Sequence, residues 1–142
     1  MRALVTLCNK HRAPDVAPGV LVVELRFDAA AIHDPSSIEI LPHRLELPET
    51  TTGITGVAVL DGRLLLGLQS RLPALAIADR QLNIEEIVRL HATRDVHSLL
   101  AHGGFVFMAS TGTDQITTWS PGSPDVVVTT VGSGESDTLH LN

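Results

Sequence analysis

The chain has 142 residues, a formal net charge of −6, three phenylalanines, one tryptophan and no tyrosine. This length fits one domain, and the acidic balance with few aromatic rings argues against a nucleic-acid partner, which requires basic grooves and stacking platforms. No apolar run approaches the ~20 residues that cross a bilayer, and the N-terminal stretch becomes polar too quickly for a signal peptide. The single cysteine, Cys8, cannot form an internal disulfide. Together these features predict a cytoplasmic protein with no membrane partner and no nucleic-acid partner.

The first 52 residues contain short apolar runs separated by polar loops. β-Branched and apolar residues predict strands at 3–7 and 19–27. A helical turn that could begin at 29–32 is stopped by the turn residues at 34–37. Residues 37–47 alternate apolar with polar side chains and are divided by Pro42, which predicts an outer, partly exposed strand or a pair of strands.

From Gly53 onwards the sequence predicts a regular series of short strands. Residues 82–90 also fit an amphipathic helix, but the equivalent stretch of the next unit, 126–130, is strongly β-branched, so we predict a strand here too. The four strands predicted for this unit are 54–60, 63–68, 75–78 and 84–90.

A repeat carries the prediction of the fold. Residues 53–88 align without a gap on 95–130, so that Asp61-Gly62 meets Gly103-Gly104, both dipeptides suited to a tight hairpin, and Ile77 meets Trp119. A period of roughly 40–45 residues with several short strands per unit is typical of β-propeller blades. The continuous apolar run at 105–109 fits strands covered on both faces, as in such blades, and Trp119 is expected to pack between two of them.

The predicted fold is therefore all-β, a β-propeller-like array of about three four-stranded blades in a single partial domain, 1–142. The approximate units are 1–52, 53–94, 95–136 and the start of a further unit at 137–142. Propellers need at least four blades, so three explanations stay open. The chain is the first part of a longer protein with further C-terminal blades, or a homodimer closes the ring, or the fold is another all-β arrangement such as a sandwich. The gapless period favours the first two.

Two histidines near the starts of first strands suggest a metal site. His97 follows Asp95 by two residues, and His140 follows Asp137 by three. First strands line the central channel of a propeller, where neutral imidazoles converging from successive blades can bind a divalent metal ion. The alternative is that each pair forms hydrogen bonds with loop backbone. Thr55, at the equivalent position one unit earlier, is no metal ligand and argues against a symmetric metal cage.

The run 110–114 joins two predicted strands and is rich in hydroxyl groups. Its polar side chains could bind a sugar or a phosphate, although such a run more often satisfies its own backbone in a turn. The candidate ligand-binding residues are Ser110, Thr111, Thr113 and Asp114. The remaining histidines in polar or loop surroundings are expected to be solvated: His33, His43, His91 and His102.

Six stretches in this order along the chain carry a resemblance to a known family. They are Ala3–Asn9, Thr55–Ala58, Gln69–Ser70, Asp95–Leu99, Ser110–Asp114 and His140–Asn142. With these motifs the chain resembles an uncharacterised family of bacterial six-bladed β-propellers, conserved proteins of unknown function. The resemblance covers most of the chain and implies a six-bladed propeller, with no established activity to carry over. Members of that family continue beyond their His-Leu-Asn motif, so the resemblance implies that this chain is an N-terminal portion.

Two functions follow as hypotheses. The first is a binding or scaffold module without a catalytic site, presenting its loops to a ligand that the sequence does not identify. The second is a metal-dependent enzyme of the lactonase, lyase or hydrolase type that uses the channel histidines His97 and His140. The metal-ligand set is incomplete, which favours the binding module, and whether the protein is an enzyme stays open. A third reading is that the chain is only a folding unit of a larger protein.

Overall fold

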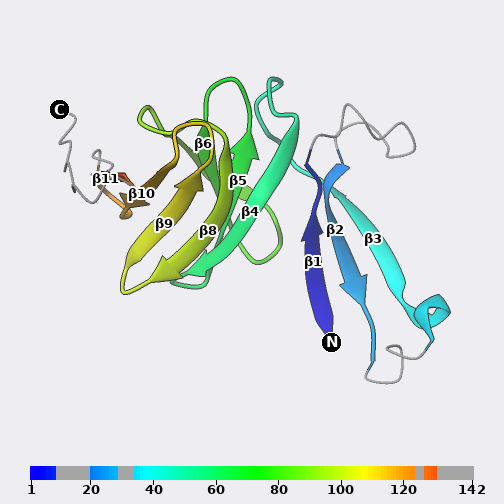
Figure 1. The fold of residues 1–142 in the computed structure, drawn as a ribbon. Helices are drawn as coiled ribbons and strands as arrows, with labels where there is room; N and C mark the ends of the chain where they lie inside the picture. Colours follow the sequence, from blue (N-terminus) through cyan, green and yellow to red (C-terminus); the bar gives the residue numbers. More distant parts are fainter. Residues whose placement is uncertain (9–19, 29–33, 124–126, 131–142) are drawn as a thin grey trace.

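The computed structural model is all-β over the residues that it describes, 1–8, 20–28, 34–123 and 127–130 (Figure 1). Within these residues the strands form three antiparallel sheets in sequence order, and no helix has the length and hydropathy to cross a membrane. Sheet A contains β1 (Arg2–Thr6), β2 (Val20–Arg26) and β3 (Glu39–Arg44), with the 3₁₀ turn η3 (Pro35–Ser37) before β3. Sheet B contains β4 (Gly53–Leu60), β5 (Arg63–Gln69), β6 (Ala74–Ala78) and β7 (Ile84–Arg89). Sheet C contains β8 (Val96–His102), β9 (Phe105–Ser110), β10 (Gln115–Trp119) and β11 (Val127–Thr130).

The strands lie within two residues of those that the sequence predicts, except that β3 ends three residues before the predicted end at residue 47. The ambiguous segment 82–90 contains strand β7, because its apolar residues pair with β6 and pack on a sheet instead of closing a helix. The stretch divided by Pro42 is one strand, β3, at an edge of sheet A. An edge strand tolerates proline, which has no backbone N–H group, because one side of the strand forms no hydrogen bonds with a neighbouring strand.

The predicted match of Ile77 with Trp119 is wrong by one residue. Ile77 pairs with Leu65 in sheet B, whereas Thr118 pairs with Phe107 in sheet C. The second strands therefore correspond at a spacing of 42 residues and the third strands at 41. Adjacent residues of a strand point to opposite faces, so this shift lets Ile77 face sheet C while Trp119 faces sheet B.

Sheets B and C pack face to face through a shared apolar core (Figure 1). Sheet B contributes Leu65, Leu75 and Ile77, sheet C contributes Met108 and Trp119, and each of these residues is at most 4% exposed. Trp119 thus packs between two sheets, as predicted. Since fully burying one large apolar side chain is worth about 1.5–3 kcal/mol, this core supplies the main attraction between sheets B and C.

The two sheets approach most closely where β8 crosses a pair of glycines. A Cβ atom on Gly56 would lie 3.0 Å from the backbone nitrogen and from Cγ of Leu99, and one on Gly67 would lie 3.2 Å from Val96. The Thr55 hydroxyl donates a hydrogen bond to the carbonyl of Val96 across the same contact. A side chain at Gly56 would press on the Leu99 backbone, so this glycine permits the close approach of the two sheets.

Sheets A and B share a second apolar core. Val22 of β2 packs with Leu66, Leu68 and Ala76 of sheet B, and all four are buried. The amide of Ile54 donates a 2.8 Å hydrogen bond to the carbonyl of the residue that follows β1, Leu7. Sheet B is therefore covered on both faces, by sheet A on one and by sheet C on the other.

Glu24 is a buried charge on the face of sheet A that turns toward sheet B, with 1% of its side chain exposed. Its carboxylate lies 2.6 Å from Nε of Arg26, 2.9 Å from Nη2 of Arg2 and 3.3 Å from Nε2 of His43. The hydrogen bond from Arg26 is the largest cause that lowers the pKa of Glu24; burial opposes it, and the charge of Arg2 adds to it. The cationic neighbours thus keep this carboxylate ionised where burial alone would favour its protonated form.

Replacing Gly56 with valine should loosen the contact between sheets B and C. The new side chain meets the Leu99 backbone, which cannot rotate away, so we expect Gly56→Val to lower the free energy of unfolding by about 1–3 kcal/mol in urea denaturation. The control is Gly103→Asn: no atom lies within 4 Å of its added Cβ, and asparagine tolerates its φ of 59°. An equal loss in both variants would contradict the packing role of Gly56.

Candidate functional site

The candidate residues of the sequence analysis that the structure describes gather at one end of sheets B and C. Three connections meet there: β5–β6 (70–73), β7–β8 (90–95) and β9–β10 (111–114). We call this the loop end. Backbone hydrogen bonds join the last two connections: Thr111 N–H donates to Asp95 O and Gly112 N–H donates to Arg94 O, both at 3.2 Å. The loop end is therefore built jointly by the two sheets.

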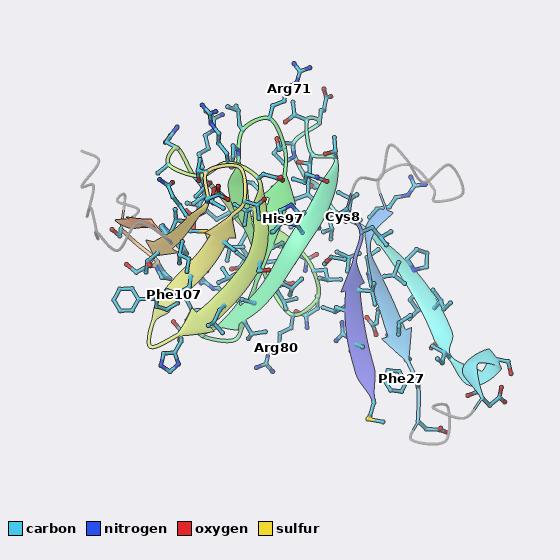
Figure 2. The ribbon with its side chains drawn as sticks, viewed as in Figure 1. Cys8, Phe27, Arg71, Arg80, His97 and Phe107 are labelled. Atoms are coloured by element: carbon cyan, nitrogen blue, oxygen red, sulfur yellow. The ribbon has the colours of Figure 1, made fainter. Side chains whose placement is uncertain are left out.

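Asp95 and His97 form a pair at the start of β8, and Figure 2 labels His97. The imidazole Nε2 lies 3.3 Å from Oδ2 of Asp95, and both side chains are about half exposed. The pairing register of β8 with β9 shifts around His97, and that of β4 with β5 shifts around Thr55, so both residues occupy irregular positions at the starts of first strands. Such bulges re-aim a side chain out of the regular alternation.

The structure brings together only half of the predicted metal site. Asp137 and His140 lie outside the described residues. Within the described ranges, no group of three or more His, Cys, Asp or Glu side chains is placed to hold one metal ion. The Asp95–His97 pair is thus a two-residue constellation with room for solvent around it.

The hydroxyl-rich corner 110–114 satisfies backbone groups. Ser110, which is 1% exposed, donates its hydroxyl hydrogen to Arg94 O at 2.6 Å and accepts the Arg94 N–H at 2.8 Å. The Ser110 and Thr113 hydroxyls lie 2.8 Å apart, and Thr111 contacts Asp95 O at 3.2 Å. The exposed Asp114 has a φ of 52°. Among these residues Ser110 acts as an anchor that fixes the backbone of Arg94.

Arg94 belongs to a basic pocket at the loop end that the sequence analysis does not single out. The cavity has a volume of about 220 Å³. Its lining comes from the β5–β6 connection and from the end of β7 with the residues that follow it: Arg71, Leu72, Pro73, Arg89, Leu90, His91, Thr93 and Arg94. The three arginines are exposed, and none forms an ion pair with another described residue; no acidic residue lines the cavity. Figure 2 shows Arg71 extending from this end of the molecule.

The floor of the basic pocket is tied to the core. Leu90 is 1% exposed and belongs to the core between sheets B and C, and its amide donates to Pro73 O at 2.9 Å. Thr93 is buried and donates its hydroxyl hydrogen to Leu90 O at 3.3 Å. Hydrogen bonds therefore hold the backbone that carries Arg94, and strand pairing holds the backbone of Arg89.

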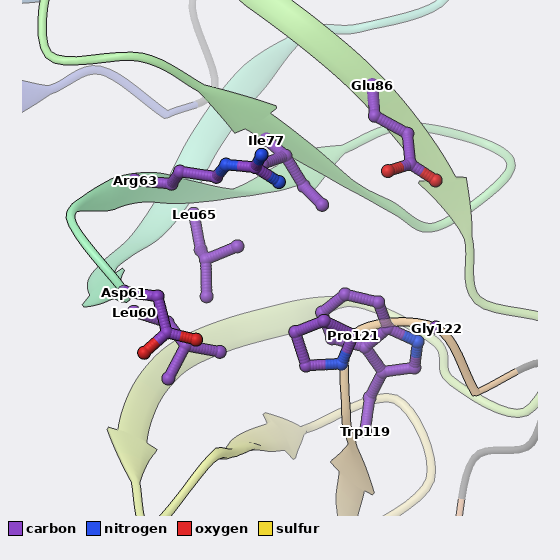
Figure 3. Close-up of a pocket in the computed structure, with 9 residues that line it drawn as sticks. All are labelled: Leu60, Asp61, Arg63, Leu65, Ile77, Glu86, Trp119, Pro121 and Gly122. Atoms are coloured by element: carbon purple, nitrogen blue, oxygen red, sulfur yellow. The ribbon is translucent and has the colours of Figure 1, made fainter.

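A larger pocket, of about 400 Å³, lies between sheets B and C at the opposite end (Figure 3). Its apolar lining includes Leu65, Ile77 and Trp119, and its charged residues are Asp61, Arg63 and Glu86. The guanidinium of Arg63 already faces a carboxylate, with Nε 3.1 Å from Oε2 of Glu85 outside the pocket lining. Mixed charges with a neutralised arginine give this pocket no clear preference for a ligand, so the basic pocket is the stronger candidate.

The sequence contained one usable signal for the basic pocket. In an antiparallel sheet with strands in sequence order, every second connection lies at the same end. Arg71 follows β5, and Arg89 and Arg94 lie at the end of β7 and just beyond, so the strand prediction alone places all three near one another. His91, expected to be a solvated loop residue, is exposed as predicted and also lines the pocket.

Comparison of the chain with protein-family models, with curated protein sequences and with solved structures found no match.

Removing the Ser110 hydroxyl should destabilise the loop end. The Arg94 N–H loses its bond to the Ser110 hydroxyl, and the Arg94 carbonyl keeps only the bond from Gly112 N–H, so we expect Ser110→Ala to lower the free energy of unfolding by about 1–3 kcal/mol in urea denaturation. The control is Thr111→Val, whose exposed hydroxyl contacts should cost less than about 0.5 kcal/mol. If Ser110→Ala proves as mild as the control, Ser110 is no structural anchor and its hydroxyl is free for a ligand.

Proposed function

We propose that this chain is a binding module made of consecutive blades of a β-propeller and that its basic pocket holds an anionic small molecule. Several features support the blade arrangement. Each sheet is an antiparallel meander, successive sheets pack face to face, and the first strand of sheet C packs on the first strand of sheet B through the Gly56 contact. The family resemblance of the sequence points the same way. The exposed free thiol of Cys8 fits the cytoplasmic location that we propose with it.

The observation that carries the binding function is the set of Arg71, Arg89 and Arg94 around one cavity without an acid. Guanidinium groups bind carboxylate and phosphate oxygens through paired, charge-assisted hydrogen bonds. In a chain with a net charge of −6, three arginines that form no ion pair with a described residue give a local positive potential that attracts anions. The cavity volume of about 220 Å³ suits one phosphate group or a small polycarboxylate.

Neutralising one arginine of the pocket should weaken anion binding. We expect Arg89→Gln and Arg94→Gln each to raise the dissociation constant for inorganic phosphate or citrate about tenfold, because a hydrogen bond to a charged group is worth about 1.5–3 kcal/mol. Calorimetric titration at low ionic strength measures the change, and added salt should weaken binding to the unmodified protein.

The matched control is Arg80→Gln at the other end of sheet B. Arg80 is exposed and lines a different cavity, so its loss changes the net charge equally without touching the basic pocket. If all three variants bind phosphate and citrate equally, or if the unmodified protein binds neither, the proposed anion site is wrong.

The Asp95–His97 pair supports a second candidate function, that of a metal-dependent lactonase, lyase or hydrolase. A carboxylate that orients a histidine is a common partner of a metal-bound imidazole. For this enzyme we expect purified protein to carry a divalent metal in stoichiometric amount and to lose it in His97→Ala, as measured by elemental analysis. Metal content and thermal stability that do not change in His97→Ala would exclude the pair as a metal site.

A further inference from the structure

Sheet A has an apolar face that no described residue covers. Strand pairing places Leu4, Val22 and Glu24 on the face toward sheet B, so Ala3, Val5, Val23 and Leu25 point the other way. Val5 is 41% exposed there, and Ile40 is 64% exposed. The six side chains of this outer face are all apolar: Ala3, Val5, Val23, Leu25, Ile40 and Pro42.

Sheet C has an uncovered face as well. Its Val106, Met108 and Trp119 side chains point into the core shared with sheet B, so the alternate residues point away. On the outer face Leu100 is 63% exposed, Phe105 48% and Ile116 39%. This face consists of Ser98, Leu100, His102, Phe105, Phe107, Ala109, Ile116 and Thr118. An apolar area of this kind on a sheet marks an interaction surface.

The outer face of sheet C has a covered counterpart in sheet B. Phe107 pairs with Leu100 and Thr118 as Leu65 pairs with Ala58 and Ile77, so the pairing registers of the two sheets superpose these positions. Leu65 and Ile77 are 2% and 4% exposed because sheet C lies on them. We call the face of a sheet that packs on the next sheet along the chain its forward face. The face that packs on the previous sheet is its backward face.

We propose that the forward face of sheet C in one copy of this chain packs on the backward face of sheet A in a second copy, and that the same contact forms twice to close a ring of six sheets. The chain carries both halves of the required interface, because the A–B and B–C contacts already join a forward to a backward face. A head-to-tail interface of this type closes into a ring when its rotation permits, and six sheets lie within the 4–8 blades of known propellers.

The first test is the solution mass of the purified chain by light scattering on a sizing column. We expect one species at twice the 15.2 kDa of a single chain, at every concentration measured. Leu100→Glu changes the forward face of sheet C, and Ile40→Glu changes the backward face of sheet A. Each substitution places a charge in both copies of the interface, so each should weaken dimerisation at least tenfold.

The control variant is Val59→Glu, which alters an equally exposed apolar residue of β4 that lies outside both outer faces and outside the basic pocket. It should stay dimeric, and circular dichroism should show the same strand content in all variants. A monomeric unmodified chain would mean that something else, such as further sheets of a longer protein, covers these faces. Open polymers would exclude closure with two copies. A dimer that is lost in only one of the two face variants would indicate that the same face of each copy forms the contact. Each of these results overturns the proposal, and none affects the anion site, whose residues lie outside the two faces.

Discussion

The arrangement of sheets B and C depends on the contact between β8 and the glycine pair of β4 and β5. At Gly56 the backbone nitrogen of Leu99 lies 3.0 Å from the position of an added Cβ atom, a distance shorter than ordinary van der Waals contact. This distance lets the Thr55 hydroxyl reach the carbonyl of Val96 and lets Trp119 fill the space between the sheets. A larger residue at Gly56 would separate the sheets, expose part of their apolar core and move the start of β8.

The same contact determines the candidate site, because the basic pocket uses parts of both sheets. Arg71 and Arg89 belong to sheet B, whereas the backbone of Arg94 is held by Ser110 of sheet C. Docking of sheet C therefore fixes the position of Arg94 beside Arg71 and Arg89. An anion that binds the docked form alone would stabilise it by mass action, so ligand binding and the packing of the two sheets are thermodynamically linked.

The sequence predicted the strands well because their determinants are local: β-branched apolar runs and the hairpin dipeptides Asp61-Gly62 and Gly103-Gly104. It placed Trp119 one residue off, because register between strands depends on tertiary packing that a gapless alignment ignores. The sequence left two roles open for the Ser110 hydroxyl, to bind a ligand or to bind backbone groups in a turn, because the same residue types serve both. The structure assigns that hydroxyl to the backbone of Arg94. The basic pocket was missed because its arginines are separated in the sequence. They suggest an anion site only when the fold brings them close together.

One disagreement between pattern and structure is itself informative. The run 105–109 is apolar on both faces of β9, a pattern typical of a strand that is covered twice, yet among the described residues only the face with Val106 and Met108 is covered. Strand β7, whose exposed positions include Glu85 and Glu86, shows that this chain places charges at exposed positions of a strand. The chain therefore has charged residues at other exposed strand positions, and the phenylalanines at 105 and 107 distinguish this face from them. The outer faces of sheets C and A thus share the apolar character that the proposed contact between two copies requires.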